Sequence, residues 1–365
     1  MNDDGAAVIA WLDSNPSPSA GGALNSVRDS VIRSVILGQT SITTNNTNGF
    51  REPEFVTPAN AVPNIAGPFS NLSQPSVSMT NSVGGTAAID YAFFDTQQQA
   101  RRLDDGGVSQ GTIPPGGAPP VNPTTSNLTE FFNTSVPLAV ANRRTDKLQV
   151  VVAGRNISFP NRVGAEIPFP PSNFPAFRYV NEGQPSETDG DDVVQHVEVD
   201  WFDTTQNIVF VYSIFDDSVG GTGLYARVWN AALSAPVTNE IVVAAAQPGV
   251  FNIFPDVAIV DSDQSFLVTW TRRTGTTDTT VLLNRFDVLT STALLTNPLS
   301  VDGGLTEVVP NRNSLSRVAT KRNGDAVVVW QTGEAIANTP NVKVFGRLYT
   351  NASTGGPASG AGGMF

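Results

Sequence analysis

The sequence has no cysteine and only one histidine among its 365 residues. The absence of cysteine excludes a disulfide framework, a thiolate metal site and a cysteine nucleophile. With His196 alone, zinc motifs that need two histidines are impossible, and a Ser-His-Asp triad would have to use this residue. No G-x-S-x-G motif accompanies it, and its setting, VQHVEV, alternates like a half-buried strand. We therefore expect His196 to be structural.

Charge and long apolar runs are also scarce. Charged residues make up 15% of the chain, and the net charge is −12 because acidic residues predominate. Phosphate backbones attract basic surfaces, so we expect no nucleic-acid partner. No apolar run reaches the roughly 18 residues of a membrane-spanning helix, so we expect no membrane insertion. The N-terminal segment has no basic start and too short an apolar run for a signal peptide, so none is visible in this chain.

Turn-forming and apolar residues are plentiful instead. The chain contains 32 Gly and 26 Pro, and 40% of its residues are hydrophobic. No window has a sustained 3.6-residue apolar period, so helices are not expected. This profile is typical of many short strands joined by turns, and it predicts an all-β protein.

One motif recurs along the chain and has its clearest copy in NGDAVVVW, residues 323–330. An Asn-Gly pair favours a hairpin turn, and the unbroken apolar run that follows is typical of a strand buried on both faces. Copies follow one another at intervals of about 60 residues over most of the chain. The strand ends at the marker positions Trp11, Tyr91, Val152, Tyr212, Trp270 and Trp330. The next strand of each copy carries an arginine, namely Arg33, Arg102, Arg178, Arg227, Arg285 and Arg347.

Six copies of a four-stranded unit predict a β-propeller of about six blades, because such units bury both faces only by packing against one another. A β-sandwich array and a β-solenoid are the alternatives. The expected repeats form a single domain with approximate limits 1–74, 75–136, 137–193, 194–252, 253–312 and 313–350. A Gly/Ser-rich tail, 351–365, follows and has a poor strand sequence, so the last unit is expected to lack a clear fourth strand.

The motifs PDVAIVDSDQSFLVTW…LLNRFDV and SRVATKRNGDAVVVW…VFGRLYT resemble a repeat of large bacterial cell-surface and secreted proteins. In that repeat, an Asp/Asn-Gly turn precedes a Val-rich strand ending in Trp, and a later strand carries an x-Arg-Phe-Asp pattern. The resemblance covers residues 195–349 best. It implies an extracellular or cell-surface location and a structural or binding role, and it transfers no catalytic residue.

An acidic segment, SETDGDD, offers the best candidate for a cation site. Glu187, Asp189, Asp191 and Asp192 could supply oxygen ligands to Ca²⁺, and Gly190 would let the loop wrap around the ion. The alternative is a solvated acidic loop. No further cofactor is expected.

No catalytic constellation is visible, so we expect a non-enzymatic, extracellular, structural or adhesive propeller, as a subunit of a surface assembly, matrix or filament. Its partners would be protein subunits or glycans. The repeated arginines are expected to pair with carboxylates such as Asp287 and Asp104, or with loop carbonyls. The alternative is a glycan-binding or glycan-hydrolysing propeller with its site in the central funnel. Clustered arginine and paired carboxylates there would favour it.

Overall fold

The computed structural model of this chain describes residues 150–156, 158–167, 177–187, 190–275, 278–302, 314–320, 324–332, 335–336, 339–340, 343–349 and 363–364, together with the backbone of the strands that precede residue 150. Its contacts divide it into two compact units. Unit 1 comprises Met1–Ser158 and Ala165–Phe177, and unit 2 comprises Phe159–Gly164 and Arg178–Phe365. All regular structure in the described residues is β, apart from one short 3₁₀ turn, η2 (Pro185–Glu187). The all-β prediction is therefore confirmed.

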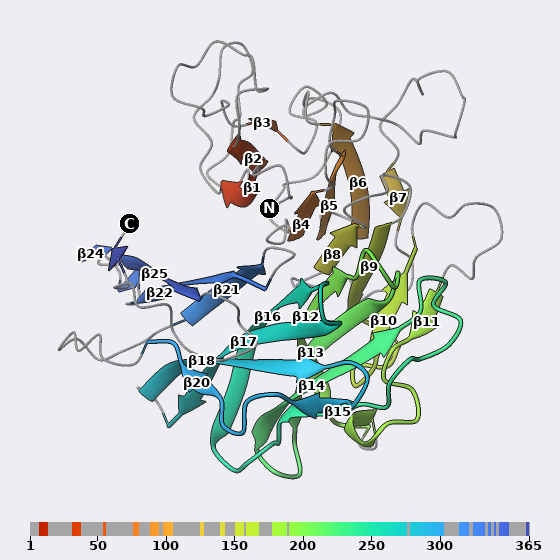
Figure 1. Ribbon diagram of the computed structural model, residues 1–365, viewed down its shortest axis with the longest axis vertical. Helices are drawn as coiled ribbons and strands as arrows, with labels where there is room; N and C mark the ends of the chain where they lie inside the picture. The colour runs from red at the N-terminus through yellow and green to blue at the C-terminus, as the bar shows by residue number, and fades with distance from the viewer. Residues whose placement is uncertain are drawn as a thin grey trace. The chain divides into compact units, whose positions relative to one another are not determined.

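The strands before residue 180 form three successive sheets (Figure 1). The first has three strands, β1 (Ala7–Asp13), β2 (Val31–Leu37) and β3 (Glu54–Phe55). The second has four, β4 (Ser76–Met79), β5 (Ala88–Phe94), β6 (Gln98–Asp104) and β7 (Thr125–Asn127). The third also has four, β8 (Ala139–Asn142), β9 (Val150–Arg155), β10 (Val163–Glu166) and β11 (Phe177–Tyr179).

Apart from a small hairpin, the remaining strands of unit 2 form one nine-stranded and one four-stranded sheet. We divide them into three antiparallel sets, because a single parallel pair, Thr222 with Phe251, joins the two halves of the larger sheet. The first set is β12 (Val193–Trp201), β13 (Ile208–Asp216), β14 (Gly221–Trp229) and β15 (Ile241–Ala244). The second is β16 (Val250–Val260), β17 (Ser265–Thr274), β18 (Asp278–Asp287), β19 (Thr292–Ala293) and β20 (Leu299–Ser300). The third is β21 (Ser314–Thr320), β22 (Ala326–Thr332), β25 (Lys343–Tyr349) and β26 (Gly363–Met364). A small hairpin, β23 (Ala335–Ile336) and β24 (Thr339–Pro340), lies between β22 and β25 in sequence.

The last strand, β26, corrects one expectation. The Gly/Ser-rich tail was expected to contribute no strand, yet Gly363 and Met364 pair with Gly346 and Phe345 of β25. Backbone hydrogen bonds form a ladder whatever the side chains are, so a sequence with low strand propensity can still complete a sheet that is already in place.

Consecutive sets of unit 2 pack face to face through the second strand of each. In β17, Phe266, Val268 and Trp270 belong to a core shared with β12–β15, whereas Leu267 belongs to a core shared with β21–β25. Successive residues of a strand point to opposite faces, so an unbroken apolar run supplies both cores. Gly324 adopts a φ of 91° before β22, which suits the expected hairpin turn.

None of the described residues belongs to a helix long and apolar enough to cross a membrane.

Candidate functional site

The first strands of the three sets in unit 2 hold ionisable residues at the same register position. These strands, β12, β16 and β21, are neighbours, with β16 packed against both of the others (Figure 1). In each, one residue pairs with the residue that directly precedes a marker position of the next strand. The pairs are Glu198 with Val211, Asp256 with Thr269, and Arg317 with Val329. We call Glu198, Asp256 and Arg317 the inner-strand cluster.

A β-bulge interrupts each of these strands just before the cluster residue. The register shifts between Val194 and His196, between Ile253 and Asp256, and between Ser314 and Arg317. Phe254 and Leu315, which lie in the second and third bulges, have φ angles of 52° and 51°. Such angles are strained for residues with large side chains, and bulges next to functional sites redirect side chains. A bulge with a left-handed residue therefore directly precedes both Asp256 and Arg317.

The three side chains are in electrostatic contact and in part accessible. Nη1 of Arg317 lies 3.4 Å from Oε1 of Glu198, and the two side chains are 53% and 20% exposed. Oδ2 of Asp256 accepts a 2.6 Å hydrogen bond from the backbone N–H of Val318. Asp200, two residues after Glu198, accepts a 3.0 Å hydrogen bond from the N–H of Ile259. The carboxylates of one inner strand are therefore tied to the backbone of the next.

The cluster shifts the acidity of both carboxyl groups. Burial raises the pKa of Glu198, Asp256 raises it further, and Arg317 opposes the rise. Burial also raises the pKa of Asp256, but Arg317 and the N–H groups of Val318 and Val257 favour its charged form. The rise is larger for Glu198 than for Asp256. Two carboxyl groups with separated affinities for a proton are the requirement for paired acid and base chemistry.

His196 lies beside this cluster, on the same strand as Glu198. Its Nδ1 atom is 3.0 Å from Oγ of Ser213, and its ring meets that of Phe254 edge-on at a centroid distance of 4.7 Å. Burial, assisted by the charge of Arg317, lowers the pKa of His196 to about 4. The ring is therefore neutral at pH 7.

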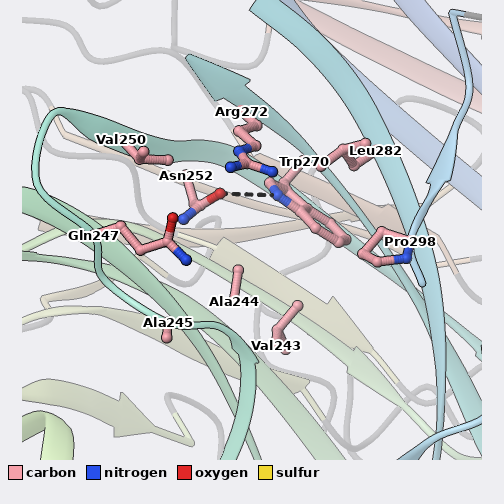
Figure 2. Close-up of a pocket in the computed structure, with 10 residues that line it drawn as sticks. All are labelled: Val243, Ala244, Ala245, Gln247, Val250, Asn252, Trp270, Arg272, Leu282 and Pro298. Atoms are coloured by element: carbon pink, nitrogen blue, oxygen red, sulfur yellow. Dashed lines mark hydrogen bonds between the residues drawn. The ribbon is translucent and has the colours of Figure 1, made fainter. Parts of the chain in front are cut away.

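A concave feature lies in unit 2 between the β12–β15 and β16–β20 sets (Figure 2). We call it the Trp270 cleft; it has a volume of about 160 Å³, and its walls include Val243, Gln247, Asn252, Trp270, Arg272 and Pro298. The indole Nε1–H of Trp270 donates a 3.2 Å hydrogen bond to Oδ1 of Asn252. Nδ2 of Asn252 in turn donates a 2.8 Å bond to the carbonyl of Thr222. These bonds hold the indole ring in place.

The sequence-predicted marker positions are distributed as follows. Val152, Tyr212, Trp270 and Trp330 are at most 1% exposed. Trp11 and Tyr91 lie in β1 and β5, but their side chains are outside the described part of the structure. The six positions remain a prediction as repeat markers, and those that are described lie in the interior.

The arginines do not all hold equivalent positions. Arg227 pairs in register with Phe210, two residues before Tyr212, and Arg347 pairs with Val328, two residues before Trp330. Arg285 instead pairs with Leu267, three residues before Trp270. A slip of one residue turns a side chain to the opposite face of the sheet, so Arg285 is not the counterpart of Arg227.

The partners of these arginines differ accordingly. Arg227 donates to the carbonyls of Val180, Glu182 and Thr238, as expected for a loop-binding arginine. Arg285 is 1% exposed and forms an ion pair with Asp263, not with Asp287. Asp287 accepts hydrogen bonds from Thr290.

The three remaining arginines of the repeat lie in β2, β6 and β11. Arg178 is an exposed residue of β11, and Arg33 and Arg102 lie in β2 and β6 with side chains outside the described residues. Asp104 is the last residue of β6, and its side chain is also outside the described residues. Arg178 belongs to neither the inner-strand cluster nor the Trp270 cleft.

The acidic segment proposed for Ca²⁺ is described in part. Glu187 forms an ion pair with Arg162 and accepts a hydrogen bond from the N–H of Gly183, and Asp192 is 5% exposed and accepts one from Asp217. Asp191 is described, whereas Asp189 lies outside the described residues. Among the residues that are described, no group of three or more acidic or histidine side chains is arranged to hold a metal ion. The Ca²⁺ site remains a prediction.

The inner-strand cluster was not found from the sequence, although a signal for it exists. Its members are three different residue types separated by about 60 positions, so no local motif contains them. Each lies 13 or 14 residues before a marker position, and this constant offset could have identified Glu198, Asp256 and Arg317 as neighbours in space.

No family model and no curated protein sequence matches the chain. Comparison with solved structures gives distant similarities. AofleA from Arthrobotrys oligospora is 11% identical with a TM-score of 0.44, covering 88% of this chain and 78% of its own. TolB from Acinetobacter baumannii is 13% identical with a TM-score of 0.46, covering 96% of this chain and 62% of its own. An α-L-arabinofuranosidase from Clostridium thermocellum is 9% identical with a TM-score of 0.37, covering 80% of this chain and 94% of its own.

The expectation that the chain is not an enzyme requires correction. Other solved structures that match it are also enzymes by name, including an α-L-arabinanase from Penicillium chrysogenum and an α-L-arabinofuranosidase from Podospora anserina. The expectation rested on the absence of a catalytic set in the sequence. A local motif search misses residues such as Glu198 and Asp256, which lie at equivalent register positions of two separate strands that pack against each other.

Proposed function

We propose that this protein is a glycan-hydrolysing β-propeller whose active site is the inner-strand cluster. The observation that supports it most strongly is the placement of Glu198 and Asp256 at equivalent register positions of two strands that pack against each other, with Arg317 beside Glu198. Two carboxyl groups flanking a glycosidic bond are the usual machinery of glycoside hydrolysis. Paired carboxylates favour this function over a purely structural one, and the cluster holds a single arginine, Arg317, beside them.

The roles follow from the two environments. Glu198, whose pKa is raised further, is the general acid that protonates the leaving oxygen of the glycosidic bond. Asp256 accepts backbone hydrogen bonds that favour its charged form, so it acts as the base for an attacking water or as the nucleophile. Arg317 is half exposed beside Glu198. Its positive charge disfavours the state in which both carboxyl groups are protonated, and its guanidinium can donate a hydrogen bond to a sugar hydroxyl.

The finer architecture is part of the proposal. We take the six antiparallel sets among the described strands as six blades, with β12, β16 and β21 as innermost strands lining the central funnel. The face-to-face packing of the three sets in unit 2 supports this assignment. An extracellular location agrees with a glycan substrate and with the resemblance to bacterial surface repeats.

The experiment is a hydrolysis screen of the full-length chain. Distantly similar solved structures are complexes with arabinobiose, Fucα1-6GlcNAc and cellotriose, and these saccharides provide a first panel to extend with longer glycans. A double variant, Glu198→Gln with Asp256→Asn, is the background control. We expect release of reducing ends by the native protein and none by the variant. Equal release by both, or no release from any glycan, contradicts the proposal. The anomer released first then distinguishes retention from inversion.

A further inference from the structure

Two polar side chains on the rim of the Trp270 cleft have no partner in the described part of the chain. Arg272 and Gln247 are both exposed, and neither side chain forms a hydrogen bond or ion pair with another described residue. Figure 2 shows the guanidinium of Arg272 beside Trp270 and the amide of Gln247 extending into the same space from the opposite side. A planar cation and a planar amide thus face one small cavity.

Arg272 is not part of the repeating structure. It lies two residues after Trp270, and the positions two residues after Tyr212 and Trp330 hold Ile214 and Thr332. A residue required by each unit would recur, so this arginine serves something specific to its own unit. Arg273, the next residue, has a packing role: its guanidinium lies 4.5 Å from the ring centroid of Phe251. Adjacent strand residues point to opposite faces, so the two arginines have separate surroundings.

The base of the cleft is apolar and fixed. Val243 and Trp270 are almost fully buried, and Leu282 and Pro298 line the wall nearby. Gly221 lets the backbone of Gln247 approach closely, because a Cβ atom at position 221 would lie 2.0 Å from the carbonyl oxygen of Gln247. The cavity of about 160 Å³ is smaller than the roughly 300–1,000 Å³ of pockets for drug-sized ligands. One sugar ring is therefore an appropriate size of occupant.

We propose that the Trp270 cleft is a binding subsite for one uronic-acid residue of a glycan, with Arg272 recognising its carboxylate. A guanidinium binds a carboxylate through two parallel hydrogen bonds, a geometry that a hydroxyl cannot match. The amide of Gln247 binds ring hydroxyls, and the apolar wall accepts the C–H face of the ring. On a chain of net charge −12, an unpaired arginine supplies the local cation that an acidic ligand needs. The choice of a saccharide rests on the proposed function, whereas the carboxylate preference rests on Arg272.

The test is calorimetric titration of the full chain with four probes: D-galacturonate, its methyl ester, D-galactose and acetate. We expect galacturonate to bind about tenfold or more tightly than the ester or galactose, because only it offers a charged acceptor. Arg272→Gln should abolish this preference. Arg273→Gln removes the same charge one residue away, on the other face, and should leave the preference intact.

Three results overturn the subsite: equal binding of galacturonate and its ester, an unchanged preference in the Arg272 variant, or acetate binding as tightly as galacturonate. The last would mean that the ring contributes nothing. Failure of the proposed function is distinguishable. Glu198→Gln leaves the cleft intact and should keep full galacturonate binding while losing hydrolysis. A protein that binds galacturonate through Arg272 but hydrolyses no glycan would contradict the proposed function alone.

Discussion

Asp256 and Val318 are 62 positions apart in sequence, yet the Asp256 carboxylate accepts a 2.6 Å hydrogen bond from the Val318 N–H. The bond crosses from the first strand of one set to the first strand of the next and places Asp256 beside Arg317, whose side chain reaches Glu198. The first strands of the three sets of unit 2 are thereby joined through ionisable groups. Packing alone could have used apolar residues at these positions, as it does at Val257 and Val318.

The buried tryptophans should be major contributors to stability. Trp330 is 1% exposed and stacks on Phe345 in the core between the second and third sets of unit 2. Trp330→Ala should lower the free energy of unfolding by about 3–5 kcal/mol, through lost burial and a residual cavity. Leu348→Ala, at a side chain 65% exposed on the adjacent β25, should change it by less than about 0.5 kcal/mol. Urea denaturation measures both, and a cost below about 1 kcal/mol at Trp330 would contradict the packing described.

Removal of the Asp263 carboxylate should leave a buried cation without its counter-ion. Arg285 is 1% exposed, and Asp263 is 43% exposed. Asp263→Ala should cost about 1–3 kcal/mol in unfolding free energy, less than for a fully buried pair because water can reach the vacated position. Asp287→Ala removes the same charge at the end of β18, where the carboxylate accepts hydrogen bonds from Thr290 instead of pairing with Arg285. Thermal melts should show a clear loss for the first variant and a smaller one for the second; the reverse order would refute the pairing.

His196 should make the protein less stable in acid. Its pKa is lowered from the ordinary 6.5 to about 4, so between these values the unfolded chain binds a proton that the native protein does not. The contribution to stability is therefore complete above pH 6.5 and is lost as the pH falls toward 4. Denaturation of the native protein and of His196→Asn, each measured at pH 7 and at pH 5, isolates the contribution of His196 to the free energy of unfolding. We expect the native protein to lose about 1–2 kcal/mol more than the variant over this interval. Equal losses would mean that the imidazole protonates freely.

Arg317 should set the pH range of hydrolysis. Its charge lowers the pKa of both Glu198 and Asp256, so Arg317→Gln allows both values to rise. The acid limb of the pH–rate profile follows the base and the alkaline limb follows the acid, so both limbs should move to higher pH, by about 0.5–1 unit. Arg178→Gln, at an exposed arginine of β11 outside the cluster, should leave the profile in place. A profile that Arg317→Gln leaves unmoved would remove Arg317 from the cluster.

Much of the architecture was predictable because it depends on local pattern. The unbroken apolar runs that end at Tyr212 and Trp270 are strands buried on both faces, as sequence periodicity indicates, whereas the run that ends at Trp330 is buried on one face and half-buried on the other. Patterns that depend on register were not predictable. The arginine motif looks alike around Arg227 and Arg285, but pairing differs by one residue, so the two side chains occupy opposite faces.

The candidate site could not be predicted from local sequence patterns, for a related reason. Bulges before His196, Asp256 and Arg317 shift the ladder by a residue, and strand pairing fixes which side chains meet only after these shifts are known. A strained φ at Phe254 or Leu315 leaves no mark in the sequence. The charges at equivalent positions are Glu, Asp and Arg, so a search for conserved repeat residues passes over them.

The central claim, that Glu198 is the acid of a glycan-hydrolysing pair, is tested most directly by comparing the turnover of the native protein with that of Glu198→Gln. The comparison uses the glycan identified in the hydrolysis screen at saturating concentration, and melting temperatures verify that both proteins are folded. Loss of general-acid catalysis should reduce kcat by about 10²–10⁴-fold without unfolding the protein. A folded Glu198→Gln variant that retains native turnover would show that the inner-strand cluster is structural, and would contradict the account.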